Sequence, residues 1–327
     1  MALYNRLKLL NNFLRQKPLV NHGPVEVEIE ATNRCNLACP MCNRSQMDRP
    51  LGDMSWETFK KIVEQTKNTA EIYYFCGLGE QLMHPLLPKM INYCNNVGAA
   101  TGLPTNAHFL GQSETEALLQ NQPSFLVISL DAMTKETYAK IRVGGDFKRV
   151  VENTKYYLKR YLKEKPKTQL VMQFVDQEEN HTELVEFIKY WKGQGAPLVR
   201  IKPRTPLNNK PNQKGTGCLN LWRSLYVTWN GEVFPCPCAM GTNRESFRLG
   251  NIHQKSLGQI WNGESWQSLR ASFKQKNKHP LCAVCWFRQP KKAVAILMSF
   301  LPTKQIIRTT PCFERLEQLT SLRFWQW

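Results

Sequence analysis

The sequence predicts an α/β fold, in which a parallel sheet with crossover helices is followed by a small cysteine-rich module. Six short apolar, β-branched or aromatic runs alternate with amphipathic stretches over residues 25–202, a pattern typical of parallel strands joined by helices. Residues 203–217 are rich in Pro, Gly and Asn, as linkers are. Residues 218–290 carry five cysteines and little periodicity, which is expected of a small module held together by metal.

The predicted strands and helices alternate regularly along the first part of the chain. The strands are Val25–Thr32, Glu71–Phe75, Ala99–Pro104, Phe125–Leu130, Gln169–Val175 and Leu198–Lys202. The helices between them are Ser55–Lys67, His84–Asn96, Ser113–Gln120, Lys148–Lys163 and Thr182–Lys192. Six such units do not fill an eight-stranded barrel. We therefore expect an open partial barrel or a doubly wound sheet, with ligands at the carboxyl ends of the strands.

The charge is strongly positive and uneven. The formal net charge is +18, and from residue 196 onward 20 Lys and Arg stand against 5 Asp and Glu. A basic half can attract nucleic acid, an anionic membrane surface or an acidic substrate, and a well-solvated basic surface is the alternative. Thiolate-held iron–sulfur clusters are anionic, so part of this charge can also balance them.

The cysteines indicate a reducing compartment. The chain has 11 cysteines, and its first twenty residues are broken by charged and polar side chains, so they form no signal-peptide core. We therefore expect a cytoplasmic protein, in which clustered cysteines bind metal or take part in catalysis. Residues 2–16 and 291–308 mix Leu, Ile and Phe with Lys and Arg. Each segment could lie on a membrane surface or dock on the protein's own core.

Three cysteines directly after the first predicted strand form the strongest motif. Cys35, Cys39 and Cys42 have the spacing C-x3-C-x2-C. Soft thiolates select iron–sulfur clusters or zinc, and three protein ligands leave one metal position open for chemistry. The alternative is a structural zinc site that takes its fourth ligand from His84 or Cys76.

This motif resembles the hallmark of the radical S-adenosylmethionine (SAM) superfamily, which lies in the loop after the first strand of a partial (β/α)6 barrel. The resemblance implies that the three cysteines bind a [4Fe–4S] cluster, whose fourth iron is chelated by SAM. One electron then yields methionine and a 5′-deoxyadenosyl radical, which removes a hydrogen atom from the substrate. Met41 stands where the family commonly has an aromatic residue, and an apolar Met can still shield the cluster.

Further positions match the family's SAM-binding motifs in order along the chain. Gly77-Leu-Gly79-Glu80 resembles the Gly-Gly-Glu-Pro motif at the end of the second strand, with Leu78 and Gln81 replacing the usual Gly and Pro. The resemblance implies that Glu80 accepts a hydrogen bond from the SAM ammonium group. An ordinary turn is the alternative for this segment.

Similar matches follow the third and fourth predicted strands. Thr105-Asn106-Ala107 is similar to the family's Thr-Asn-Gly. The resemblance assigns Ser129 and Asp131 to the SAM ribose, and residues two apart on a strand point to the same face. A helix N-cap is the alternative for Asp131. Substrate-side candidates near the predicted barrel mouth are Gln173, Asp176, Lys202 and Arg204.

The second cysteine group resembles the SPASM or twitch modules of the same superfamily. Cys218, Gly231 and Cys236 fit the pattern C-x(9–15)-G-x4-C. Between the cysteines, Asn230-Gly231 predicts a β-hairpin turn. With Cys282 and Cys285 these cysteines supply four thiolates for one auxiliary [4Fe–4S] cluster. Zinc is the alternative for this set.

The resemblance divides the chain into four parts. An amphipathic helix (1–24) precedes the radical SAM partial barrel (25–205), a SPASM/twitch-like module (206–290) and a basic, apolar tail (291–327). The fold class is thus a partial (β/α)6 barrel with a small C-terminal cysteine-rich iron–sulfur module. Cys76, Cys238 and Cys312 have no assigned role, whereas Cys94, on the same predicted helix as Ile91, looks like core.

The resemblance indicates an oxidoreductase or a maturase, and it fixes the initiating chemistry better than the substrate. The candidates are a small polar or anionic metabolite, such as an amino-sugar alcohol, and a peptide. Only about 24 residues precede the first predicted strand, which argues against a leader-peptide-binding domain. The implied partner is a reducing electron donor such as flavodoxin or ferredoxin. The competing class is a non-catalytic protein that uses zinc staples and a basic surface to bind nucleic acid.

Overall fold

The computed structural model describes residues 2–203, 218–236, 247–274 and 282. The chain forms two compact units. The barrel unit comprises Ile29–Trp56 and Tyr74–Thr205, and the module unit comprises Met1–Glu28, Glu57–Tyr73 and Pro206–Trp327. The linker 203–217 beyond Pro203, together with Arg204, Cys238, Cys285, Cys312 and the tail 291–327, lies outside the described residues.

The barrel unit is organised around an open parallel sheet. Its strands run in the order β6-β5-β4-β3-β2-β1, and β3 to β6 pair in parallel with each successive neighbour. Their bounds are β1 Glu26–Ile29, β2 Ile72–Phe75, β3 Ala100–Thr105, β4 Phe125–Ser129, β5 Gln169–Asp176 and β6 Val199–Pro203. The boundary between the two units falls within β1 and β2. The predicted partial (β/α)6 barrel is confirmed.

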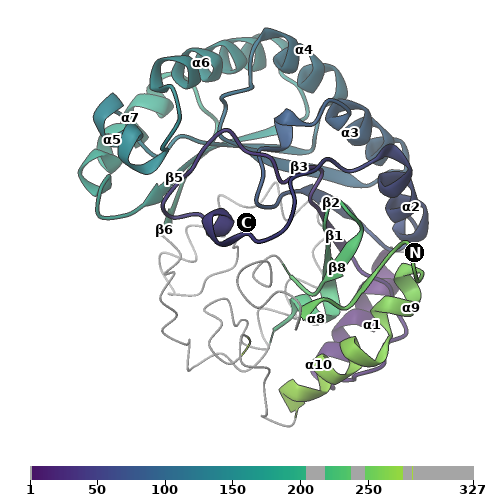
Figure 1. Ribbon diagram of the computed structural model, residues 1–327. Helices are drawn as coiled ribbons and strands as arrows, with labels where there is room; N and C mark the ends of the chain where they lie inside the picture. Colours follow the sequence, from purple (N-terminus) through teal and green to yellow (C-terminus); the bar gives the residue numbers. More distant parts are fainter. Residues whose placement is uncertain (1, 204–217, 237–246, 275–281, 283–327) are drawn as a thin grey trace. The chain divides into compact units, whose positions relative to one another are not determined.

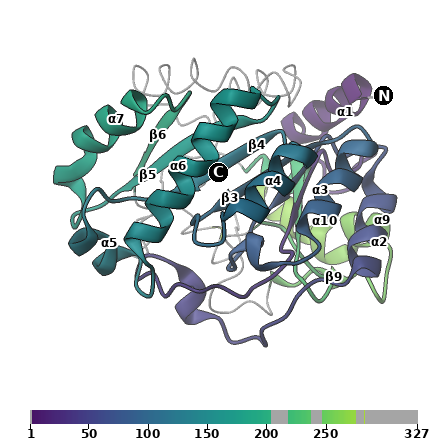
Figure 2. The same cartoon turned by 90° about the horizontal axis from the view of Figure 1, so that it is seen from above.

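Helices cover one side of this sheet (Figures 1 and 2). They are α3 Leu87–Asn96, α4 Gln112–Asn121, α5 Lys135–Ile141, α6 Phe147–Glu164 and α7 Leu184–Gly193. Short 3-10 turns lie at η1 Asn43–Gln46, η2 Gln81–Met83 and η3 His181–Glu183. All five residues of β4 are buried, as expected of an interior strand of a parallel sheet.

Two helices of the barrel unit differ from the prediction. The helix expected from His84 begins at Leu87, because the residues before it form the 3-10 turn η2 and Pro88 occupies the first helical turn. Helix α5 was not predicted. It has only seven residues, of which Tyr138 and Ile141 are buried, so it offers too little periodicity to detect.

The module unit packs its N-terminal helix on its own core. Helix α1 (Ala2–Leu14) buries Leu9, Leu10 and Phe13, and the Phe13 ring meets Trp222 edge-on at 5.5 Å between centroids. This packing agrees with the docking interpretation of residues 2–16. Within the described residues, no helix has the length and apolarity needed to cross a membrane.

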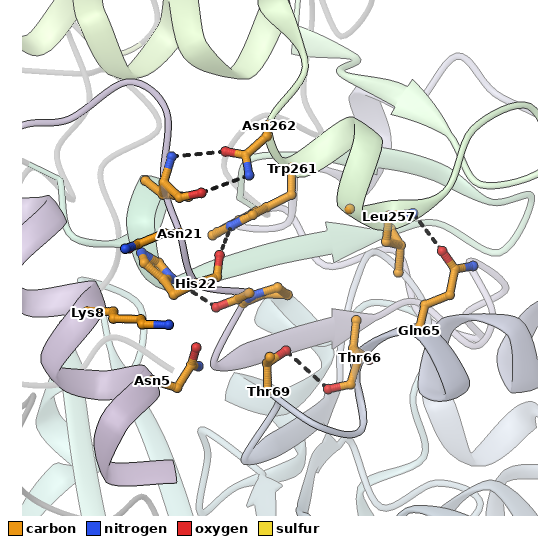
Figure 3. A pocket seen from close by; sticks show the side chains of 14 residues that line it. Asn5, Lys8, Asn21, His22, Gln65, Thr66, Thr69, Leu257, Trp261 and Asn262 are labelled. Atoms are coloured by element: carbon orange, nitrogen blue, oxygen red, sulfur yellow. Dashed lines mark hydrogen bonds between the residues drawn. The ribbon is translucent and has the colours of Figure 1, made fainter. Parts of the chain in front are cut away.

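Hydrogen bonds fix the segment after α1 to helices α8 (Asn220–Arg223) and α9 (Leu257–Trp261) and the residues that follow them. Trp222 Nε1 donates to Lys17 O, and Trp261 Nε1 donates to His22 O, each at 2.9 Å. The Asn262 side chain bonds twice to the Val20 backbone. Its Oδ1 accepts from Val20 N–H at 3.1 Å, and its Nδ2 donates to Val20 O at 2.9 Å. Figure 3 shows the His22 and Asn262 contacts.

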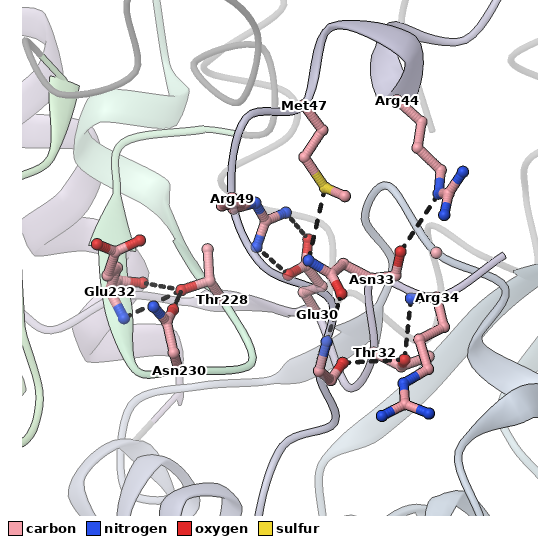
Figure 4. A network of polar contacts seen from close by, with 12 residues as sticks. Glu30, Thr32, Asn33, Arg34, Arg44, Met47, Arg49, Thr228, Asn230 and Glu232 are labelled. Atoms are coloured by element: carbon pink, nitrogen blue, oxygen red, sulfur yellow. Dashed lines mark hydrogen bonds and ion pairs between the residues drawn. The ribbon is translucent and has the colours of Figure 1, made fainter.

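The predicted β-hairpin is confirmed, with a longer turn than expected. Strand β7 (Ser224–Val227) pairs antiparallel with β8 (Glu232–Phe234), which pairs with β9 (Gly250–Asn251). Thr228 closes the turn: its N–H donates to Glu232 O at 2.9 Å, and its Oγ1 accepts from Glu232 N–H at 3.0 Å (Figure 4). Three residues therefore lie in the loop, and Gly231 has φ +81°, a left-handed conformation that suits glycine.

The module unit is more regular than the sequence indicated. Helix α10 (Glu264–Lys274) buries Trp266, Leu269, Arg270 and Phe273. Arg270 interrupts the apolar period of α10 in the sequence, because an arginine is expected at the surface. In the structure its guanidinium is buried and donates to the carbonyls of Pro18, Leu221 and Trp261 at 2.9 to 3.0 Å. Burial lowers the pKa of Arg270 to about 9.

Candidate active site

The three cysteines lie on a loop that leaves β1 and leads to helix α2 (Trp56–Thr66). All three are half-buried, and each sulfur accepts one N–H hydrogen bond. Cys35 Sγ accepts from Leu37 N–H and Cys42 Sγ from Arg44 N–H, each at 3.4 Å. Cys39 Sγ accepts from Arg142 Nη1 at 3.8 Å.

This donor set fits a four-iron cluster. Soft sulfur ligands that accept N–H bonds are the usual surroundings of such a cluster. A cube binds its three thiolates at three different irons, so the sulfurs need not converge on one point. Across the described residues, no three His, Cys, Asp or Glu side chains converge as ligands of a single ion would. Burial raises the pKa of Cys35 to about 11 and also raises that of Cys39, and a bound metal would lower both.

Buried polar contacts hold the base of the cysteine loop. Arg49 forms a two-pronged ion pair with Glu30, and both side chains are almost fully buried (Figure 4). Asn33 donates through Nδ2 to Pro50 O and accepts at Oδ1 from Gly52 N–H, both at 2.8 Å. Because both ends of the loop are tied in this way, the cysteines between them start from a fixed frame.

The residues after β2 support the same loop. A Cβ on Gly79 would lie 2.2 Å from Thr32 O and 2.9 Å from Arg34 O, so glycine is required by contact with protein backbone. Gln81 is buried, and its Oε1 accepts from Ala31 N–H at 2.9 Å while its Nε2 donates to Thr32 O at 3.2 Å. Gln81, which replaces the family's Pro, therefore links the segment after β2 to the segment after β1. Gly77 is exposed.

Glu80 is the centre of a hydrogen-bond network at the strand ends. The residue is 4% exposed, and its carboxylate accepts from Thr105 Oγ1 at 2.8 Å, Asn106 N–H at 2.7 Å and Leu82 N–H at 3.1 Å. Asn106 Nδ2 in turn donates to Asn36 Oδ1 on the cysteine loop at 3.0 Å. Burial raises the pKa of Glu80, while these hydrogen bonds lower it. Glu80 and Asn106 are thus brought together beside the loop.

Asp131 does not share a face with Ser129 by strand alternation. Strand β4 ends at Ser129, and Asp131 has φ +63°, so the period of two does not extend to it. Its carboxylate is fully buried, accepts from Val175 N–H at 2.7 Å and forms an ion pair with Arg142. It is not a helix N-cap, since Thr134 caps α5. Asp131 therefore holds the arginine that donates to Cys39.

Arg142 is a site residue that sequence reasoning missed. It follows the undetected helix α5, and the next residue accepts a hydrogen bond from the cysteine loop, Ala38 N–H to Val143 O at 2.9 Å. A basic residue directly before Val143-Gly144-Gly145 was the available signal. Gly144 has φ +88° and lies against Asn36 O.

A row of polar side chains crosses three neighbouring strands, from the last residue of β4 through the middle of β5 to the second residue of β6. Ser129 pairs in register with Gln173, and Gln173 with Arg200. Gln173 Nε2 donates to Ser129 Oγ at 3.0 Å, and its Oε1 accepts from Arg200 Nη2. Arg200 was not singled out in the sequence. Of the other substrate-side candidates, Asp176 accepts from His181 Nδ1 at 2.8 Å, and Lys202 is half-exposed.

His84, one of the alternative metal ligands, has a hydrogen-bond partner at each ring nitrogen. His84 Nδ1 accepts from Leu86 N–H at 3.1 Å and its Nε2 donates to Met54 O at 2.9 Å, so both ring nitrogens are already used. Cys94 is fully buried, as expected of core. In the module unit Cys218, Cys236 and Cys282 are half-buried.

A thiol loop after the first strand of an open parallel barrel, next to a buried carboxylate at the strand ends, defines a cluster-binding barrel enzyme. Family models agree: residues 29–188 match the radical SAM superfamily and residues 218–286 match SPASM, an iron–sulfur cluster-binding domain. The chain belongs to the radical SAM superfamily and carries a SPASM domain. It is an enzyme whose barrel binds a [4Fe–4S] cluster with SAM, and its SPASM domain binds auxiliary iron–sulfur clusters.

Similar proteins include two curated relatives and two solved structures. The tungsten-containing aldehyde ferredoxin oxidoreductase cofactor-modifying protein of Pyrococcus furiosus is 25% identical, over 80% of this chain and 86% of that protein. The subtilosin biosynthesis protein AlbA of Bacillus subtilis is 22% identical, over 80% and 66%. Streptococcus suis SuiB bound to its precursor peptide SuiA gives a TM-score of 0.60 at 18% identity, over 83% and 73%. BtrN with AdoMet and 2-DOIA gives 0.54 at 20% identity, over 80% and 92%.

Proposed function

We propose that this radical SAM enzyme is an oxidoreductase that acts as a maturase, oxidising a side chain of a peptide or protein. The hydrogen-bonded cysteine loop of the barrel unit carries the proposal of radical chemistry. The peptide substrate is supported by the printed functions of relatives, because AlbA serves bacteriocin biosynthesis and SuiB binds a precursor peptide.

The chain's own residues have distinct roles in this proposal. Cys35, Cys39 and Cys42 hold the cluster. Glu80 orients the SAM ammonium group, with Asn106 fixing the carboxylate through its backbone N–H at 2.7 Å. Gly77 and Gly79 supply backbone beside it, and Ser129 remains the candidate for the ribose.

Asp131 acts indirectly in this proposal. Its buried carboxylate is already bonded to Arg142 and Val175, which leaves it a positioning residue. The ion pair keeps the Arg142 guanidinium next to the Cys39 sulfur.

The module unit is proposed to hold one auxiliary [4Fe–4S] cluster through Cys218, Cys236, Cys282 and Cys285. When bound, the two clusters and SAM supply hydrogen-atom abstraction and an acceptor for the remaining electron. A flavodoxin or ferredoxin is the proposed source of the initiating electron. Free, half-buried thiols and the proposed clusters favour a reducing, cytoplasmic location.

The Ser129, Gln173 and Arg200 row is the proposed substrate-facing surface. It presents a hydroxyl, an amide and a guanidinium side by side on three neighbouring strands. Guanidinium groups bind carboxylates well, so an acidic residue of the peptide is the preferred neighbour of the oxidised carbon.

Anaerobic reconstitution tests the proposal. We expect about eight irons per chain, from two four-iron sites, and 5′-deoxyadenosine formed from SAM upon reduction. Replacing the three barrel cysteines by Ala should abolish 5′-deoxyadenosine while leaving about four irons. Wild-type protein that reconstitutes fully and forms no 5′-deoxyadenosine would contradict the proposed chemistry.

A second assay tests the substrate. Short peptides encoded beside the gene are incubated with the reduced enzyme and SAM, and we expect one to lose two hydrogen atoms by mass spectrometry. Amino-sugar alcohols form the parallel arm. Oxidation of such an alcohol, with every peptide unchanged, would replace the peptide by a small metabolite as the substrate.

A further inference from the structure

The module unit contains a pocket that is lined by none of the residues assigned to the radical chemistry. It has a volume of about 460 Å³, within the usual range for small-molecule sites. It lies between helix α1, the segment that follows that helix, the end of α2 and helix α9 (Figure 3). All of its lining residues belong to the module unit.

Two residues that line this pocket each carry a buried polar atom with no hydrogen-bond partner among the residues that the structure describes. The atoms are His22 Nε2 and Asn5 Nδ2. The His22 side chain belongs to a residue only 7% exposed. Leaving such atoms unpaired is unfavourable, so a ligand that pairs with them would stabilise the site.

The protonation state of His22 is fixed by its neighbours. Its Nδ1 lies 2.9 Å from Gly23 O, and a carbonyl oxygen can only accept, so Nδ1 carries the hydrogen. Burial, helped by the charges of Arg270 and Lys8, lowers the pKa of His22 to about 4, against the opposing effect of the hydrogen bond to Gly23 O. The ring is therefore neutral at physiological pH, and Nε2 presents a lone pair that needs a donor.

The remaining charge in the pocket is positive. Of the fourteen described residues that line it, only Lys8 carries a formal charge at neutral pH. Lys8 and Asn5 extend from α1 toward the segment that carries His22 (Figure 3). The site thus offers an ammonium group, an amide donor and an imidazole acceptor.

We propose that this pocket binds a small oxyanion that also carries a hydrogen-bond donor, with Lys8 and Asn5 on the anionic oxygens and His22 Nε2 on the donor. Carboxylates with a neighbouring hydroxyl and monohydrogen phosphate both have this chemistry. Neither a barrel-unit residue nor a cysteine proposed to hold a cluster lines the pocket, so this inference does not rest on the proposed radical reaction.

Calorimetric titration of the full-length, anaerobically reconstituted protein at constant ionic strength tests this site. The probes are phosphate, L-lactate and acetate, the last being a carboxylate without a donor. We expect saturable binding of phosphate, lactate or both, whichever anion the site selects, and about tenfold weaker binding of acetate, because it leaves His22 Nε2 unpaired.

Three variants locate the binding. Lys8→Gln should weaken every anion at least about tenfold, because a charge-assisted bond is lost. Lys60→Gln, which changes an exposed lysine of α2 outside the pocket, should leave affinity unchanged. His22→Phe should lower the affinity for the preferred probe to that for acetate. Asn5→Leu provides a second test should His22→Phe fail to fold.

Two results would overturn the proposal. One is the absence of saturable binding for both phosphate and lactate across the millimolar range. The other is equal affinity in Lys8→Gln and Lys60→Gln, which would assign the binding to general surface charge. Neither result bears on 5′-deoxyadenosine formation, so failure here and failure of the proposed function are separate.

Discussion

Replacing Gly79 by Ala should disrupt the support of the cysteine loop. The new Cβ would lie 2.2 Å from Thr32 O, 2.8 Å from Thr32 C and 2.9 Å from Arg34 O. Favourable contacts between heavy atoms lie near 3.5–4.0 Å, so one backbone segment must move by about 1 Å. Side-chain rearrangement cannot relieve the clash, because all three contacted atoms belong to the main chain.

The cost is set by how firmly Thr32 is held. Its Oγ1 donates to Asp53 Oδ1 at 2.6 Å, and its carbonyl accepts from Gln81 Nε2 at 3.2 Å. A shift of Thr32 stretches these hydrogen bonds and displaces the chain that leaves β1. Overpacking typically costs about 1–3 kcal/mol, and we expect Gly79→Ala at the upper end of that range.

Gly193→Ala is the matched control, because its Cβ would meet nothing within 4 Å. Gly193 ends helix α7 in the same unit, and alanine there should be neutral or stabilising by up to about 1 kcal/mol. Anaerobic urea unfolding by circular dichroism measures both variants, and hydrogen exchange localises the loss to residues 29–36 and 74–82. Equal unfolding midpoints and equal iron contents for the two variants would refute the steric argument.

Two further predictions concern buried polar groups. Gln81→Met keeps the side-chain volume but leaves Ala31 N–H and Thr32 O without their bonds to Gln81; at about 1–3 kcal/mol for each of the two unpaired groups, urea unfolding should show a loss of about 2–6 kcal/mol. Gln120→Met, at an exposed position of α4, should change little, and a similar loss there would attribute the effect to methionine itself. Glu26 is buried beside Arg223, and burial raises its pKa from 4.5 to about 7. The native state then holds the proton more tightly than the unfolded state, so this group's contribution to stability falls between pH 4.5 and 7 by up to roughly 3 kcal/mol. Glu26→Gln should flatten that fall in unfolding measured from pH 5 to 8, and an unchanged pH slope would contradict the assignment.

The strands and the cysteine loop could be predicted because their signals are local. A buried parallel strand is a short apolar run, and β4 and β5 begin at the expected residues Phe125 and Gln169. The three barrel cysteines were singled out by their spacing and by the soft ligation that thiolates offer, and they lie on the expected loop after β1. The hairpin was found because Asn-Gly is a strong local turn signal, although Thr228 lengthened the turn.

The orientation of Asp131 could not be predicted, because it depends on a positive φ angle. An extended strand through residue 131 would have placed its carboxylate beside Ser129. The observed φ of +63° turns it toward Val175 and Arg142 instead. A left-handed residue other than glycine leaves no mark in periodicity, and only the tertiary contacts explain why it is tolerated.

Residues whose role is given by a distant partner were missed for a shared physical reason. In a pattern of apolar and polar residues, a buried Arg or Gln is indistinguishable from one at the surface. Arg142 and Gln81 support the cysteine loop, and Arg270 fixes the segment before His22, yet each reads as solvent-facing. Burial of such groups is costly unless they are hydrogen-bonded, so each must have partners that the linear pattern does not reveal. The same principle supports the proposed anion site. His22 Nε2 and Asn5 Nδ2 are buried without a hydrogen-bond partner in the described residues, and a bound ligand would supply that partner.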